Sequence, residues 1–259
     1  MLFVIDAGNT NIVFAVYDGG VKQAAWRCRT DGAQTADEYA AFLRQMFALS
    51  DLAFSDISEA IVSSVVPAAD FQLRQLCQTH FSCRPKVVDY ALVKDRVRVL
   101  LEKPQEVGAD RLVNAIAVKA FYRAPAIVVD FGTATTFDVV DAAGAYVGGA
   151  IAPGINLSMD ALHRAAAKLP RIDIQKPGSV IGTNTVDAMR SGVYWGYVCL
   201  VEGMVRHIAK EMEEKPFVLA TGGLAALIAG GTDVIDQIDD ELTLKGLVHI
   251  HSINKEKRS

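Results

Sequence analysis

A short pattern that occurs twice decides the fold of this chain. Residues 3–20 read FVIDAGNTNIVFAVYDGG, and residues 128–144 read VVDFGTATTFDVVDAAG. A shift of 124 positions places Asp6 on Asp130, and a glycine follows each aspartate two residues later. Each copy predicts a strand with an aspartate at its end, a turn of glycine and small polar residues, and two further strands. The duplication predicts two similar halves that face one another across a cleft.

The segments around these two units predict helices and strands in alternation. A helix is expected after the cap residue Thr35, because apolar residues then recur at helical spacing. Another helix is expected to start near Pro104, which puts Asp110 in its first turn. The sequence therefore predicts an α/β protein of two domains, residues 1–120 and 121–259.

Composition argues against several classes of partner. The 259 residues are 51% hydrophobic and include 26 basic and 30 acidic side chains, a formal net charge of −4. A nucleic-acid partner is not expected without a basic excess, and the apolar runs are too short to predict a membrane-spanning helix. The four cysteines form no C-x-x-C pair, so we expect reduced thiols in the core of a cytoplasmic protein.

The two aspartate turns have a structural and a chemical interpretation. Aspartate accepts hydrogen bonds from nearby backbone N–H groups and glycine adopts positive φ, so one such turn needs no ligand. Two turns at equivalent positions favour a nucleotide site, where N–H groups and hydroxyls approach phosphate oxygens and the carboxylate orients Mg²⁺. The common phosphate motifs G-x-x-x-x-G-K-[ST] and G-x-G-x-x-G are absent from the sequence.

These turns resemble the phosphate loops of the actin and sugar-kinase superfold. The resembling segments are DAGNT at 6–10, DFGT at 130–133 and TGG at 221–223. The resemblance implies duplicated actin-like (ribonuclease H-like) α/β domains, each a mixed sheet with flanking helices, and a cleft between them. It also implies that the first two segments bind phosphates and that the last contacts adenosine.

Within that superfold the sequence is similar to one family, the bacterial type III pantothenate kinases. The motifs run in order along almost the whole chain: DAGNTN at 6–11, PQEVGADRLVNA at 104–115, VVDFGTATTFDVV at 128–140, GGAIAPGI at 148–155, IGTNTVDAMRSG at 181–192 and ATGG at 220–223. The resemblance implies ATP-dependent phosphorylation of the primary hydroxyl of pantothenate to 4'-phosphopantothenate, the first step of coenzyme A biosynthesis, by a homodimer.

The same resemblance implies a role for individual residues. Asp110 matches the general base that accepts the proton of the substrate hydroxyl; the alternative interpretation is an acidic residue favoured at a helix start. Asp130 matches a ligand of a monovalent cation, potassium or ammonium. ATP contacts are implied for Asp6, Ala7, Gly8, Asn9, Thr10, Asn11, Ile12, Val13 and Thr133. Pantothenate contacts are implied for Gly108, Ala109, Asp110, Arg111 and Thr185, the last from the partner subunit.

Some features depart from this pattern or leave it open. Leu101 and Lys103 stand where the family often has tyrosine and asparagine, so a phenol contact to the substrate is expected to be missing. Two alternative functions stay open: a kinase of the same superfold that acts on another sugar or acid, and a nucleotide-binding regulator without turnover.

His249 and His251 are expected as an ordinary pair on one face of a strand, because a zinc site needs more ligands. The predicted long helix, about 183–213, is a candidate for the dimer contact.

Overall fold

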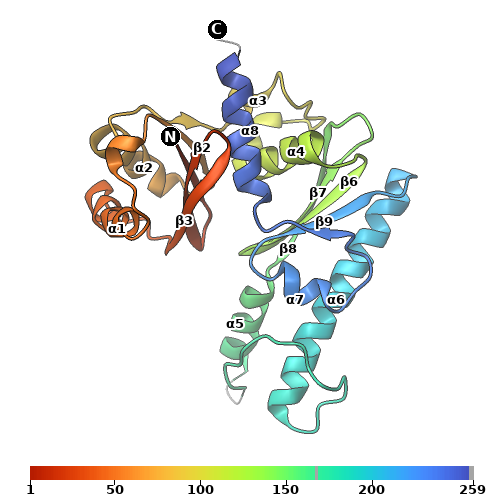
Figure 1. The fold of residues 1–259 in the computed structure, drawn as a ribbon. Coiled ribbons are helices and arrows are strands. Elements are labelled where there is room, and N and C mark those ends of the chain that lie inside the picture. Colours follow the sequence, from red (N-terminus) through yellow and green to blue (C-terminus); the bar gives the residue numbers. More distant parts are fainter. Residues whose placement is uncertain (167–168, 257–259) are drawn as a thin grey trace. The chain divides into compact units, whose positions relative to one another are not determined.

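The computed structural model describes residues 1–166 and 169–256, which form two compact units. The first unit contains Met1–Ala120 together with the residues from Leu242 on, and the second contains Phe121–Glu241. Each unit is built on one five-stranded sheet with helices packed against it (Figure 1). The two-sheet α/β architecture expected from the repeated pattern is therefore confirmed.

The sheet of the first unit has the strand order β3-β2-β1-β4-β5. Strand β1 is antiparallel to β2 and parallel to β4, so the sheet is mixed. Its strands are β1 Leu2–Ala7, β2 Asn11–Asp18, β3 Val21–Arg29, β4 Glu59–Ser64 and β5 Lys86–Val87. Its helices are α1 Ala36–Ala48, α2 Pro67–His80, α3 Tyr90–Val93, α4 Ala109–Phe121 and α8 Leu242–Glu256, with short 3₁₀ turns at Phe54–Asp56 and Pro104–Glu106.

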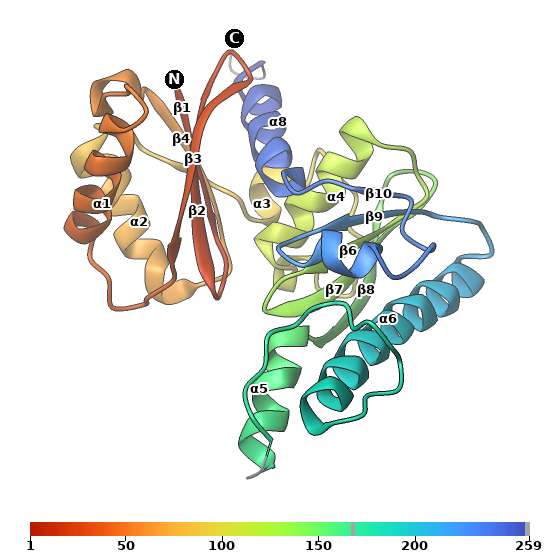
Figure 2. The same cartoon turned by 60° about the horizontal axis from the view of Figure 1, so that its bottom comes forward.

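Alternation along β1 separates a hydrophobic core from a polar strand end. Phe3 and Ile5 are fully buried against α1 and α2, where Leu43 and Phe47 complete the same core. Helices α1 and α2 lie on one side of the sheet and α8 lies on the other (Figure 2). Because successive side chains of a strand point to opposite faces, Asp6 lies on the face turned away from this core.

The sheet of the second unit repeats this arrangement in the order β10-β9-β6-β7-β8. Strand β6 is antiparallel to β7 and parallel to β9, just as β1 is antiparallel to β2 and parallel to β4. Its strands are β6 Ala126–Phe131, β7 Ala134–Val140, β8 Tyr146–Pro153, β9 Phe217–Thr221 and β10 Gln237–Ile238, and its helices are α5 Ile155–Ala165, α6 Thr185–Met212 and α7 Ala225–Ala229. The internal duplication predicted from the sequence is thus present in the fold.

The expected strand at His249 and His251 is wrong, because both residues lie on α8. Residues two apart on a helix are about 200° apart, so the two imidazoles do not share a face. The run V-H-I-H alternates like a strand, but Leu247 and Ile250 recur at helical spacing and are fully buried. Hydrophobic burial therefore decides between two local patterns in favour of the helix.

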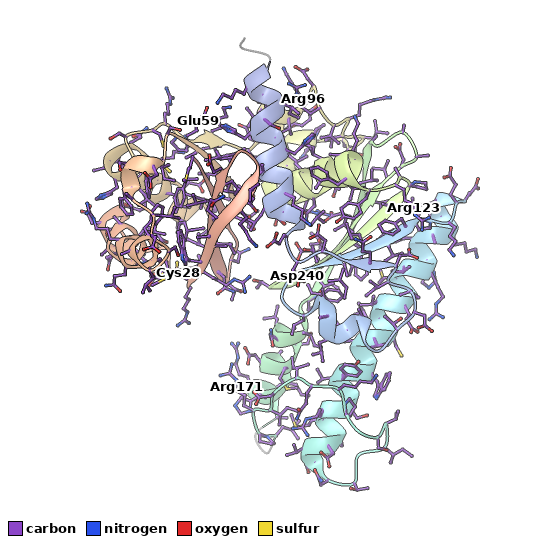
Figure 3. All side chains as sticks on the ribbon, viewed as in Figure 1. Cys28, Glu59, Arg96, Arg123, Arg171 and Asp240 are labelled. Atoms are coloured by element: carbon purple, nitrogen blue, oxygen red, sulfur yellow. The ribbon has the colours of Figure 1, made fainter. Side chains whose placement is uncertain are left out.

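Helix α8 belongs with the first unit, whereas the sequence predicts residues 121–259 as one domain. His251 Nε2 lies 3.3 Å and Lys255 Nζ 3.0 Å from a Glu59 carboxylate oxygen of β4. Arg96 donates to the Ile253 carbonyl at 2.5 Å. Figure 3 shows Glu59 and Arg96 on either side of this helix. The contacts of α8 with the first unit therefore place the end of the second unit at Glu241.

The sequence also predicts reduced, buried cysteines and no membrane-spanning helix. All four cysteines are free, and Cys77 is buried as expected. Cys199 is exposed on α6, so the expectation that every cysteine lies in the core is wrong. None of the helices in the described part of the chain has the length and apolar character needed to cross a membrane.

Candidate functional site

Asp6 is the penultimate residue of β1, directly before the polar turn that leads to β2. It is paired with Val13 of β2 and with Ser63 of β4, so strand β1 extends one residue beyond the aspartate, to Ala7. In the turn, Gly8 N donates a hydrogen bond to the Asn11 carbonyl at 3.0 Å. The side chains that follow Gly8 in this turn are exposed: Asn9, Thr10 and Asn11. The turn therefore offers polar groups to solvent beside a carboxylate.

Ile12 and Val13, which are also expected in this nucleotide loop, have different environments. Ile12 is fully buried in the core of the first unit, so only its backbone is available to a ligand. Val13 lies on the opposite face of β2, is half-buried and stands directly beside Asp6. A ligand over the Asp6 face would thus meet the Val13 side chain.

Asp110 lies in the first turn of α4, as predicted, although this helix begins at Ala109 rather than near Pro104. A Cβ on Gly108 would lie 2.7 Å from Asp110 Oδ1, so the carboxyl group folds back over the glycine. The same Oδ1 accepts a hydrogen bond from the Arg111 backbone N–H at 2.7 Å. Gly108 therefore leaves the space in which the Asp110 carboxyl group is held.

A short chain of contacts joins this helix start to the end of β1. The position of a Gly108 Cβ is 3.5 Å from Val65 Cγ1, and Val65 N donates to the Ala7 carbonyl at 3.0 Å. Ala7 directly follows Asp6 in β1. The G-A-D-R segment and the first aspartate turn, a hundred residues apart in the sequence, thus belong to one cluster.

The Asp110 carboxylate of this cluster affects the ionisation of Asp6. The pKa of Asp6 is raised to about 7, first by burial and then by the negative charge of Asp110. The nearby Ser63 hydroxyl and the positive charge of Arg27 lower the Asp6 pKa, against these larger effects. Two neighbouring carboxyl groups repel one another when both are ionised, and a divalent cation offsets that repulsion. The donor set suits Mg²⁺, which one or two carboxylates bind together with substrate phosphates.

In the second unit, Asp130 and its turn lie against the late glycine motif. Gly222 has φ +90°, and a Cβ there would lie 2.7 Å from both Asp130 Oδ1 and the Phe131 carbonyl oxygen. Asp130 is also the direct neighbour of Thr221 in the β6–β9 ladder. Only glycine combines that backbone conformation with so close an approach. Two motifs that are 90 residues apart in sequence therefore meet.

The segment GGAIAPGI reaches the same turn. A Cβ on Gly154 would overlap the Thr133 carbonyl oxygen and would lie 2.8 Å from the Gly132 carbonyl oxygen. Gly132 N donates to the Ala134 carbonyl at 3.1 Å, a tight turn like that at Gly8. Thr133 is therefore held between the two strands β6 and β7, with Gly154 packed directly against its backbone.

The Asp130 turn brings together oxygen atoms that could bind a hard cation. A carboxylate and nearby backbone carbonyls, such as that of Phe131, are hard oxygen donors. Across the residues with described positions, no three His, Cys, Asp or Glu side chains are grouped to hold a metal ion. Such oxygen donors suit hard cations, and potassium and ammonium are the ones that the family resemblance implies.

Thr185 is the first residue of α6 and lies outside the two clusters described above. The preceding residue, Asn184, caps the helix by accepting a hydrogen bond from Asp187 N at 3.0 Å. Thr185 itself is exposed. Its hydroxyl is thus accessible at a well-defined helix start within the second unit.

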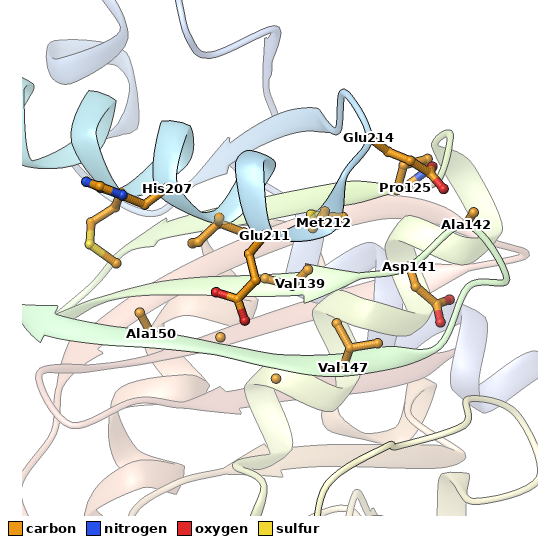
Figure 4. Close-up of a pocket in the computed structure, with 14 residues that line it drawn as sticks. Pro125, Val139, Asp141, Ala142, Val147, Ala150, His207, Glu211, Met212 and Glu214 are labelled. Carbon is orange, nitrogen blue, oxygen red and sulfur yellow. The ribbon is translucent and has the colours of Figure 1, made fainter.

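A separate cavity of about 500 Å³ lies between β8 and the C-terminal half of α6 (Figure 4). Apolar side chains such as Val139, Val147 and Met212 line it together with carboxylates, among them Glu211. None of the residues expected at the nucleotide or substrate site belongs to its lining. We therefore assign this cavity no part in the candidate site.

Sequence reasoning missed two neighbours of Asp6, namely Ser63 and Arg27. Ser63 is fully buried and lies opposite Asp6 in the parallel β1–β4 pair. Arg27 lies opposite Val13 and so shares the Asp6 face of the sheet. The strand containing Arg27 was predicted, but the register that brings it to this face depends on pairing between distant segments. No local signal identifies Ser63.

Comparisons with known proteins agree with this arrangement of motifs. The family described as type III pantothenate kinase matches residues 2–207. A protein of Paramagnetospirillum magneticum named type III pantothenate kinase is 56% identical over 254 residues, which cover 98% of each chain. One from Rhodospirillum rubrum with the same name is 55% identical over 255 residues, 98% of this chain and 99% of that protein.

Solved structures resemble the fold at low sequence identity. The activator of 2-hydroxyisocaproyl-CoA dehydratase from Clostridium difficile has a TM-score of 0.57 and 13% identity, covering 99% of this chain and 96% of its own. The inorganic polyphosphate/ATP-glucomannokinase of an Arthrobacter species has a TM-score of 0.50 and 14% identity, covering 97% of this chain and 98% of its own. The expected fold of duplicated actin-like domains is confirmed.

Proposed function

The chain belongs to the type III pantothenate kinase family, and from this premise we propose that it phosphorylates the primary hydroxyl of pantothenate with ATP. The product is 4'-phosphopantothenate, and the reaction is the first step of coenzyme A biosynthesis. One observation supports this function most directly: Asp110 lies close enough to Asp6 for its charge to raise the Asp6 pKa. A base and a phosphate-organising carboxylate are the two acids that such a transfer requires.

Asp110 is the proposed general base. As the pantothenate hydroxyl oxygen attacks the γ-phosphorus, its proton passes to the Asp110 carboxylate. The bond from the γ-phosphorus to the bridging oxygen breaks, and ADP leaves with the electron pair. The hydrogen bond from the Arg111 N–H and the space over Gly108 hold the carboxyl group in one orientation, which limits the entropy lost during reaction.

The proposed ATP contacts lie on the two aspartate turns. Backbone N–H groups and hydroxyls between Asp6 and Val13 bind phosphate oxygens, and Thr133 adds a second contact. Mg²⁺ bound with the nucleotide supplies charge neutralisation at the phosphates, and Asp6 is the carboxylate that would hold it. Asp130, with backbone carbonyl oxygens of its turn, would hold potassium or ammonium.

The proposed pantothenate contacts surround Asp110 at the start of α4. Arg111 would bind the substrate carboxylate with its planar guanidinium, which matches two carboxylate oxygens at once. Gly108 and Ala109 contribute backbone contacts. Thr185 would reach the substrate from the partner subunit of a homodimer, which makes each site dependent on both chains. The departure at Leu101 removes one phenol contact.

Coupled measurement of ADP release with and without pantothenate tests this function. Release that requires pantothenate is the expected result, and mass spectrometry of the product should find one added phosphoryl group. A panel of other acceptor alcohols separates this kinase from one that acts on a different sugar or acid. Nucleotide binding without turnover on any acceptor would instead support a regulator.

A further inference from the structure

Strand β3 places two arginines, Arg27 and Arg29, beside the Asp6 turn. Positions two apart on a strand share a face, so the two side chains point the same way. Arg27 is opposite Val13 and Arg29 is opposite Asn11 in the β2–β3 pair. Val13 is in turn opposite Asp6 in the β1–β2 pair. Both guanidinium groups therefore belong to the sheet face that carries Asp6, not to the face of the hydrophobic core.

The spacing of these groups leaves room for a phosphate. Neighbouring strands are about 4.8 Å apart, so the backbones of Asp6 and Arg27 are separated by roughly 10 Å. Val13 of β2, whose side chain is half-buried, pairs with both residues and lies between them. A phosphate above Val13 could accept hydrogen bonds from Arg27 on one side and face a cation bound by Asp6 on the other.

Both arginines are exposed and available to a ligand. Within the portion of the chain whose positions are described, neither guanidinium forms an ion pair. The positive charge of Arg27 is nevertheless close enough to lower the pKa of Asp6 against the larger effects of burial and Asp110. The arginines thus supply positive charge next to a carboxyl pair without being neutralised by it.

The end of β3 is also fastened to the phosphate turn. Thr30 Oγ1 donates to the Gly8 carbonyl at 2.6 Å, and Thr30 N donates to the Thr10 carbonyl at 3.0 Å. Arg29 directly precedes Thr30, so its backbone is fixed relative to both ends of the turn. A side chain on a supported strand can hold a ligand more accurately than one on a free loop.

We propose that Arg27 and Arg29 bind the polyphosphate of the nucleotide on the Asp6 face of the first unit, with Arg27 contacting the phosphoryl group that is transferred. This inference rests on the proposed function for the identity of the nucleotide. Arginine is suited to the task because its fixed fork of donors matches phosphate oxygens and stays charged at every relevant pH. Positive charge held at the γ-phosphoryl group also stabilises the transition state of the transfer.

The test compares Arg27→Gln and Arg29→Gln with the wild type by calorimetric titration of ATP and of adenosine, each without pantothenate. We expect Arg27→Gln to weaken ATP binding at least tenfold, in line with the loss of a charge-assisted pair of hydrogen bonds, and Arg29→Gln to weaken it less. Adenosine affinity should not change, because it has no phosphate. Arg27→Lys should bind ATP with intermediate affinity, because it keeps the charge but loses the fork.

A matched control is Lys22→Gln, which removes one positive charge from the same strand about 17 Å from Arg27. It should bind ATP as the wild type does, and thermal unfolding should show all variants folded. ATP binding unchanged in Arg27→Gln would overturn the proposal, as would an equal loss of adenosine binding. A raised KM for pantothenate with unchanged ATP affinity would also overturn it, because Arg27 would then bind the acceptor.

The ATP-binding test of Arg27→Gln does not depend on which alcohol the enzyme phosphorylates. If the wild type fails to phosphorylate pantothenate but Arg27→Gln selectively loses ATP over adenosine, the proposed function fails and this inference stands. If pantothenate is phosphorylated and the variant binds ATP normally, the inference fails and the proposed function stands. In an active enzyme, Arg27→Gln should also lower kcat about 10²-fold, the usual loss for one group that stabilises developing charge.

Discussion

The carboxyl groups of Asp6 and Asp110 interact within the first unit, where burial and the charge of Asp110 raise the pKa of Asp6 to about 7. Such an arrangement is unfavourable, because two acids share a partly buried region. Binding of a nucleotide with its divalent cation would relieve that repulsion.

The first prediction concerns the stability of Asp6→Asn as a function of pH. The pKa of an unfolded aspartate is about 4, whereas burial and the charge of Asp110 raise the pKa of Asp6 in the folded protein to about 7. Between these values the folded state binds more protons, so the free energy of unfolding falls as pH rises. The variant lacks this loss and should gain stability over the wild type between pH 5 and pH 8, by at most about 4 kcal/mol at about 1.4 kcal/mol per pKa unit.

Urea unfolding at several pH values measures this gain. Ser63→Ala should instead lower the free energy of unfolding relative to the wild type in this pH range. The Ser63 hydroxyl lowers the Asp6 pKa, so its removal should raise that pKa further. A gain in Asp6→Asn that is the same at pH 5 and pH 8 would show that the Asp6 carboxyl group does not titrate in this range.

The second prediction concerns Gly222→Ala in the second unit. The new methyl group would lie 2.7 Å from the Asp130 carboxylate and from the Phe131 carbonyl, at a backbone φ of +90°. Displacement of the turn should abolish activation by potassium and cost roughly 1–3 kcal/mol of stability. Steady-state assays in potassium and in sodium salts measure the first effect. They should give nearly equal, low rates for the variant.

Gly230→Ala is the matched control, because a Cβ there would have no neighbour closer than 3.5 Å. It should retain the potassium response of the wild type. Potassium activation that persists in Gly222→Ala would separate the cation from the Asp130 turn.

A structural feature of this protein could be predicted from the sequence when the residues that cause it lie close together in the chain. The cap of α1 could be predicted from Thr35, and in the structure its side chain accepts from Glu38 N while Glu38 accepts from Thr35 N. Both partners lie within three residues of one another. The aspartate turns were equally local, because apolar alternation stops at each of them and resumes afterwards.

The features that could not be predicted depend on distant partners. His251 follows a strand-like alternation, yet it lies on a helix because α8 packs on β1 and β4. The pairing of Asp6 with Ser63 requires the parallel register of β1 and β4, which nothing near either residue specifies. The interaction of Asp6 with Asp110 likewise depends on the packing of Gly108 against Val65.

The third prediction tests the shared active site of the proposed homodimer. Asp110→Asn and Thr185→Val should each be nearly inactive alone, because each lacks one contributor to every site. When the two variants are mixed and allowed to exchange subunits, half of the dimers are mixed and each has one intact site. The mixture should therefore reach about a quarter of the wild-type activity.

Exchange itself can be followed with two differently tagged chains and size-exclusion chromatography. Confirmed exchange without recovered activity would place Thr185 and Asp110 in the same site of a single chain, or Thr185 outside the site.

The role of Asp110 as the general base is tested most directly by the steady-state rate of Asp110→Asn with ATP and pantothenate, together with its ATP affinity. A general base contributes about 10²–10⁴-fold, so kcat should fall by that factor while the Kd for ATP stays within about threefold. Glu106→Gln is the control, because it removes a nearby exposed carboxylate that pairs with Lys103 at 3.0 Å, and its kcat should be unchanged. A kcat for Asp110→Asn within tenfold of the wild type would contradict the assignment of Asp110 as the base.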